Sequence, residues 1–205
     1  APHERTRSCP QLLVDSQAYE SWRPEAGPDE STIGSEIKID ARLQRPGGGA
    51  PDTLARKIVF ELAGTSSEPG IAMNFPLKPA DPAGLDLQFS PQSNPPSRYI
   101  ISETGSQRIE TVPGRYSTAS AVVSSFDWGA WSTLKVTAEL EDGRRLTGQF
   151  RSSSGPTDIL LPKRGKDSKI ADIWKKQAGA ALPDDDDSET GPAGTGSPGD
   201  GYSLY

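Results

Sequence analysis

Apolar and polar residues alternate along much of the middle of this chain. From Glu36 to Leu43 (EIKIDARL) every second residue is apolar, and the same spacing recurs at Ile58, Phe60 and Leu62. Successive side chains of a β-strand point to opposite faces, so this period predicts strands with one buried face. No helical period interrupts the pattern between residues 35 and 161.

Shorter alternating segments, separated by prolines and glycines, predict further strands. They cover residues 71–75, 85–89, 98–102, 106–112 and 115–124. A last alternating run, Leu134 to Leu140, is followed by Asp142-Gly143 and by a second run that ends at Phe150. Asp-Gly between two such runs predicts a two-residue hairpin turn, because both residues tolerate positive φ.

Roughly eight short strands of this kind predict an all-β protein, an antiparallel β-sandwich in which two half-apolar sheets bury their faces on each other. A barrel is the alternative. The sandwich is expected over 34–162, after an N-terminal linker or extension over 1–33. Residues 163–205 are expected to hold a short C-terminal helix, marked by Ile170, Ile173 and Trp174, and then a disordered acidic tail rich in glycine and proline.

Composition supports one strand-rich domain with tails. Of 205 residues only 33% are hydrophobic, while 21 are glycine and 19 proline. The formal net charge of −6 argues against a nucleic-acid partner. No apolar run approaches the ~18 residues that a membrane-spanning helix needs. Cys9 is the single cysteine, which excludes a disulfide within the chain and a site built from several thiolates.

Residues 114–148 (GRYSTASAVVSSFDWGAWSTLKVTAELEDGRRLTG) resemble the closing strands of bacterial immunoglobulin-like domains. The resemblance is one of pattern and extends over roughly 35–160. It implies a secreted or cell-surface module that acts as a spacer, in adhesion or in binding. The cysteine pair of immunoglobulins is absent, as is usual for the bacterial versions.

The C-terminal segment resembles thrombospondin type 3-like calcium repeats. Residues 170–174 (IADIW) stand where that family has I-P-D-x-W, and the closing GDGYSLY resembles its D-G-L element. The resemblance implies calcium as a cofactor, because calcium takes six to eight oxygen ligands. The candidate ligands are Asp172, Asp184, Asp185, Asp186, Asp187 and Asp200. Both repeats are degenerate: Lys175 replaces a glutamate, and Gly196 and Pro198 replace aspartates. On composition alone, the same residues are a solvated linker.

No residue set predicts catalysis. His3 is the only histidine, which argues against a histidine-based triad and excludes a multi-histidine zinc motif within this chain. Trp128 and Trp131 form the densest aromatic cluster, which either stacks against a sugar ring or packs on the end of the sheets.

The chain is therefore expected to be a non-catalytic structural or spacer module that contacts other domains of the same parent protein. One alternative is an adhesion module that binds a glycan or a cell-surface protein through Trp128 and Trp131. Another is the accessory region or pro-region of a secreted hydrolase whose catalytic domain lies beyond Tyr205.

Overall fold

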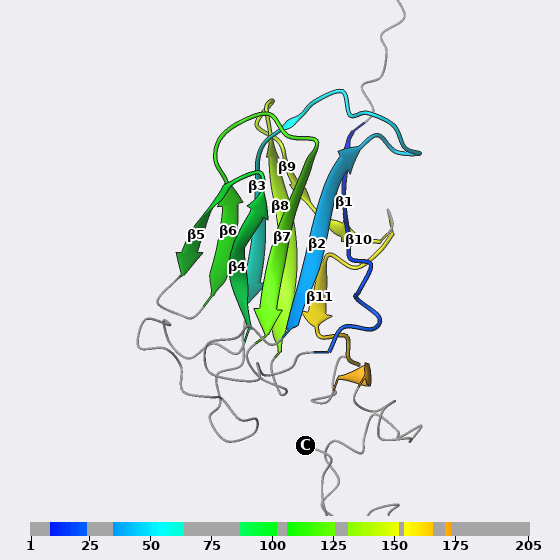
Figure 1. The fold of residues 1–205 in the computed structure, drawn as a ribbon. Coiled ribbons are helices and arrows are strands. Elements are labelled where there is room, and N and C mark those ends of the chain that lie inside the picture. The colour runs from blue at the N-terminus through cyan, green and yellow to red at the C-terminus, as the bar shows by residue number, and fades with distance from the viewer. Residues whose placement is uncertain are drawn as a thin grey trace, which may run out of the picture.

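The fold is all-β. The computed structural model describes residues 9–23, 35–63, 87–101, 106–125, 131–151, 154–165 and 171–173. The strands there form two sheets that pack face to face as a β-sandwich (Figure 1). All strand pairs are antiparallel except that of β1 with β10, which is parallel.

Sheet A has five strands in the order β10-β1-β2-β7-β4. Their bounds are β1 Gln11–Asp15, β2 Ser35–Gln44, β4 Leu87–Asn94, β7 Thr118–Ser125 and β10 Gln149–Phe150. Sheet B has the order β11-β8-β3-β6-β5, and β9 pairs with β8 outside this path. Its bounds are β3 Ala55–Ala63, β5 Ser97–Ile101, β6 Gln107–Thr111, β8 Ser132–Leu140, β9 Arg145–Thr147 and β11 Asp158–Leu161.

One hydrophobic core fills the space between the sheets. Alternate residues of β2, β3 and β8 are buried, which is the period-2 pattern of strands with one face in the core. The largest fully buried side chains come from both sheets: Leu12, Ile37, Ile39, Leu43, Ile58, Phe60, Leu62, Leu87, Leu134, Leu140 and Leu161. The all-β prediction and the two-sheet arrangement are confirmed.

A buried glutamine joins the sheets. Gln107 in β6 donates from Nε2 to the carbonyl of Leu87 in β4 at 2.6 Å, and its Oε1 accepts from the Tyr99 hydroxyl at 2.7 Å. The backbone N–H of Phe89 also donates to Oε1, at 3.4 Å. These bonds satisfy the amide inside the core and hold β4 of sheet A against β6 of sheet B.

The predicted hairpin after β8 exists, but its turn type was predicted wrongly. Three residues, 141–143, connect β8 to Arg144, whose carbonyl accepts from the N–H of Leu140 at 2.8 Å. Gly143 has φ +84°, whereas Asp142 does not have positive φ. This is the three-residue loop in which a type I turn is followed by one left-handed residue. Arg144 Nε donates to the Asp142 carboxylate at 2.9 Å, and within this loop only the glycine takes the left-handed conformation.

Three further expectations concern the N-terminal segment, the strand at 71–75 and the C-terminal helix. Residues 11–15, expected within a linker or extension, form β1, because Leu12 and Val14 alternate into the core. The strand expected at 71–75 lies outside the described residues. Of the predicted C-terminal helix only 171–173 are described; Asp172 and Ile173 are helical, and the helix stays a prediction. Within the described ranges, no helix is long and apolar enough to cross a membrane.

Candidate functional site

The predicted calcium ligands lie almost entirely outside the described residues. Asp172 alone is described; it is partly buried, and its backbone N–H donates to the carbonyl of Lys163 at 2.9 Å. Asp184, Asp185, Asp186, Asp187 and Asp200 are not described. In the described ranges, no three His, Cys, Asp or Glu side chains form a group that could hold a metal ion. The calcium site stays a prediction.

Of the two tryptophans of the predicted aromatic site, the structure describes one. Trp131 lies directly before β8 and is partly buried. Trp128 is outside the described residues, so the relative orientation of the two rings stays untested.

The structure instead brings together four side chains at the end of the sandwich where the chain leaves sheet B. We call Tyr19, Glu20, Arg151 and Lys163 the exit clasp. Glu20 accepts from Arg151 Nη1 at 2.9 Å through one carboxylate oxygen and from Lys163 Nζ at 2.6 Å through the other. The hydrogen bond from Lys163, and then the charges of both cations, lower the pKa of Glu20 from its usual 4.5.

Aromatic contacts complete the exit clasp. The guanidinium carbon of Arg151 lies 5.0 Å from the centre of the Tyr19 ring and 5.6 Å from that of Phe150. The two rings meet edge to face with their centroids 4.8 Å apart. The Tyr19 hydroxyl donates to the carbonyl of Leu160 at 3.3 Å, and burial raises the pKa of Tyr19 to about 12. Tyr19 is therefore a neutral donor at physiological pH.

The backbone explains why Arg151 reaches these partners. Arg151 has φ +66° and is the one non-glycine residue with positive φ in the described ranges. Its N–H donates to the carbonyl of Val14 at 2.6 Å, which continues the pairing of β1 with β10. A non-glycine residue in this conformation is strained and persists where its surroundings hold it. Here the parallel strand pair and the Glu20 carboxylate hold it.

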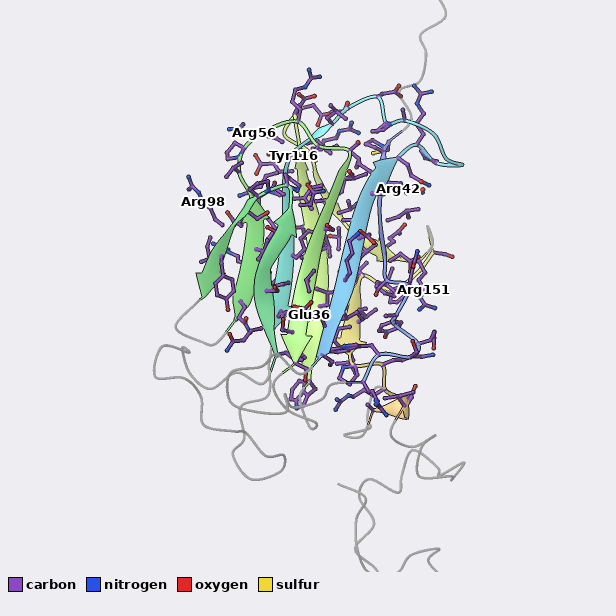
Figure 2. The ribbon with its side chains drawn as sticks, viewed as in Figure 1. Glu36, Arg42, Arg56, Arg98, Tyr116 and Arg151 are labelled. Atoms are coloured by element: carbon purple, nitrogen blue, oxygen red, sulfur yellow. The ribbon has the colours of Figure 1, made fainter. Side chains whose placement is uncertain are left out.

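The outer face of sheet A carries a polar groove of about 560 Å³. It lies across β1, β2, β7 and the end of β4. The charged and polar side chains that line it are Asp15, Gln17, Lys38, Asp40, Arg42, Gln44, Asn94, Thr118, Ser120 and Arg151. Figure 2 shows Arg42 and Arg151 on the same flank of the sandwich, while Arg56 and Arg98 lie on the other.

Neither the exit clasp nor the groove was predicted from the sequence. Glu20 lies 131 residues from Arg151 and 143 residues from Lys163, so no local motif contains the exit clasp. Lys38, Asp40, Arg42, Thr118 and Ser120 of the groove are solvent-facing positions of predicted strands. Asp15 and Gln17 were expected in the N-terminal linker, and Asn94 and Arg151 lie outside the predicted strands. The charges at alternate positions of β2, Lys38, Asp40 and Arg42, were visible in the sequence, but their neighbours on β1 and β7 depend on sheet register.

Comparisons with known proteins do not assign this chain to a family. No protein-family model matches the chain, and no curated protein matches it. Among solved structures, it is similar to two fragments of the human F-spondin reeler domain. One is 12% identical, with 75% of this chain and 93% of that chain covered and a TM-score of 0.39. The other is 11% identical, with 78% and 96% covered and a TM-score of 0.40.

The fimbrial adhesin FimA of Actinomyces is a third similar structure. It is 10% identical, with 71% of this chain and 49% of the adhesin chain covered and a TM-score of 0.24. All three TM-scores lie below 0.5, so the proposals below rest on this chain's own residues.

Proposed function

We propose that this chain is a non-catalytic, immunoglobulin-like spacer module of a secreted or cell-surface protein. Strand order supports the immunoglobulin-like topology: β1-β2-β7-β4 corresponds to strands A, B, E and D, and β11-β8-β3 to G, F and C. The departure is the β5-β6 pair, which adds to sheet B beside β3 although it follows β4 along the chain.

The observation that carries the proposal is the position of the two ends of the sandwich. β1 begins at one end, where Cys9 contacts Arg144 of the β8–β9 turn at 3.1 Å. β11 and residues 171–173 lie at the opposite end (Figure 1). A module that takes the chain in at one end and releases it at the other holds its neighbours apart. The ten residues of β2 set that separation at roughly 30 Å.

The exit clasp supports the same function. A spacer fixes geometry only if the connecting chain leaves it in a defined direction. Lys163 binds Glu20, which attaches the exit segment to the sandwich, and its carbonyl accepts from the N–H of Asp172, which holds residues 171–173 to the start of that segment. The two cations of the clasp share one carboxylate, and Arg151 also packs on Tyr19.

A distance measurement tests this proposal directly. Spin labels on the native, exposed Cys9 and on Ile173→Cys report the separation of the two ends. We expect a single narrow distribution centred beyond about 25 Å, as the strand length requires. Glu20→Ala should broaden it, because Lys163 and Arg151 lose their shared partner.

The matched control is Lys135→Ala, an exposed position of β8 outside the clasp, which should leave the distribution unchanged. A broad distribution in the unmodified chain, or a separation under about 15 Å, would contradict the spacer proposal.

Calcium remains a prediction for Asp172, Asp184 to Asp187 and Asp200. Bound there, it would neutralise the acidic run and stiffen the segment after the exit clasp. Titration calorimetry with a parallel melt in EDTA tests it. Saturable binding heat with a rise in melting temperature supports the calcium site. The absence of binding heat refutes it.

A further inference from the structure

We propose that the groove on the outer face of sheet A binds a neutral oligosaccharide. Its volume of about 560 Å³ falls within the ~300–1,000 Å³ typical of sites for small ligands. Nothing in the spacer function requires a hollow on this face, and Trp131 is not among the residues that line the groove.

Sheet register places the groove side chains in rows across the strands. Asp15 of β1 lies opposite Asp40 of β2, Asp40 opposite Ser120 of β7, and Ser120 opposite Asn94 of β4. Partners in register share a face of the sheet, and their Cβ atoms lie about 5 Å apart. This row therefore offers two carboxylates, a hydroxyl and an amide side by side.

A second row supplies donors. Leu13 of β1 lies opposite Arg42 of β2, and Arg42 opposite Thr118 of β7. Arg42 is exposed, and within the described ranges no carboxylate lies at ion-pair distance from its guanidinium. Its N–H groups are open to a ligand, next to the acceptors of the first row.

The charges of the groove are close to balanced. Lys38 pairs with Asp40 at 2.9 Å, and Arg151 lies 3.8 Å from Asp15 and also binds Glu20. A polyanion would be repelled by the carboxylates as well as attracted by the cations, so the groove gives it little binding affinity. A hydroxyl group both donates and accepts, and it can satisfy a guanidinium and a carboxylate at once.

Bulky apolar side chains are few in the groove. Val14, Ala41 and Ala119 are buried, which leaves Leu13 as the partly exposed apolar side chain of the lining. A peptide that binds through bulky apolar anchors has no pocket here. A hydroxyl-rich neutral ligand therefore fits the lining best.

Affinity electrophoresis of the full chain tests the proposal. The probes are gels containing soluble neutral polysaccharides (mannan, mixed-linkage β-glucan, arabinoxylan and galactomannan), with heparin and alginate as acidic counterparts. We expect retardation by at least one neutral polysaccharide. Arg42→Ala and Asp40→Ala should each weaken the apparent affinity about tenfold, as loss of a charged hydrogen bond predicts.

The control is Lys135→Ala on the outer face of sheet B, which should bind like the unmodified chain. Equal melting temperatures establish that the variants fold. Ser120→Tyr, which fills the floor of the groove, should abolish retardation without the loss of a charge. No retardation by any neutral probe, or retardation by acidic probes alone, overturns the proposal. Binding lost in Trp131→Ala but kept in Arg42→Ala also overturns it, because the ligand would then lie at the aromatic cluster.

Discussion

The outer faces of the two sheets carry similar charged residues but arrange them differently. On sheet B, Glu110 lies between two cations, 3.7 Å from Lys57 and 3.3 Å from Arg108. On sheet A, Asp15 and Asp40 lie directly opposite each other on neighbouring strands. On both sheets these carboxylates have cationic partners, but on sheet A two of them face each other across neighbouring strands, with the exposed Arg42 on the same face.

The difference shows how a sheet face becomes a binding surface. Opposite charges across neighbouring strands stabilise a sheet, and like charges directly opposite destabilise it. A departure from such a local rule is expected at functional sites, where the cost is offset elsewhere. On sheet A the offset comes from Lys38 and Arg151, each of which neutralises one of the two aspartates.

Removing the Gln107 hydrogen bonds that join the two sheets should have the largest effect on the free energy of unfolding. Gln107→Ala removes the amide that binds Leu87, Phe89 and Tyr99 in the core. It leaves buried polar groups unpaired and opens a small cavity, so we expect a loss of about 2–4 kcal/mol in the free energy of unfolding. Urea denaturation measures it, with Gln44→Ala on the sheet A surface as a near-neutral control. A loss below about 1 kcal/mol would show that the link is dispensable.

Gly155→Ala should disturb the rim of the sheet A groove and leave sheet B intact. A Cβ at Gly155 would lie 1.8 Å from the carbonyl oxygen of Phe150, so the loop after Arg151 must move. We expect a destabilisation of about 1–3 kcal/mol. Amide exchange should rise around Arg151 and stay unchanged in β3 and β6. Ser154→Ala is the control, and an unchanged unfolding midpoint for Gly155→Ala would refute the close approach.

Two charge removals, one on each sheet, should differ in the sign of their effect on the free energy of unfolding. Glu110→Ala removes the partner of two cations on sheet B, and we expect a loss of about 0.5–1 kcal/mol. Asp15→Asn removes the repulsion across to Asp40 and also the long ion pair with Arg151 at 3.8 Å, but keeps the oxygen that accepts from the N–H of Ser16. It should be neutral or stabilising by a few tenths of a kcal/mol, roughly the size of a cross-strand pair. Thermal melts at low salt check both, and equal losses would remove the contrast between the faces.

The smallest expected effect is the pH response of the exit clasp. The pKa of folded Glu20 lies below its usual 4.5, so its stabilising contribution is fully present above pH 4.5. The contribution is lost as the pH falls through the lower, folded value. The melting temperature of Glu20→Gln should therefore lie slightly below that of the unmodified chain at pH 6, and the gap should narrow as the pH falls below 4.5. A gap of constant size across that acid range would mean that charge is not what Glu20 contributes.

The fold was predictable where the signal is local. The alternation around Ile37 and Ile39, and that of β3 and β8, gave strands with the correct buried face. The hairpin after β8 was predictable in position but not in turn type, because Asp-Gly fits both a two-residue turn and a three-residue loop that ends in a left-handed glycine. The exit clasp was not predictable, because its partners are more than a hundred residues apart.

The sequence by itself determined that this chain forms strands and which side of each strand is buried, because a period of two residues is a property of neighbouring positions. It also determined the net charge of −6 and the presence of a single histidine and a single cysteine. Only the tertiary structure decided which strands lie side by side, and hence that Asp15 lies opposite Asp40 on the face that carries Arg42, and that Arg151 reaches Glu20. These neighbours follow from register between distant segments, which is fixed by the packing of one shared core.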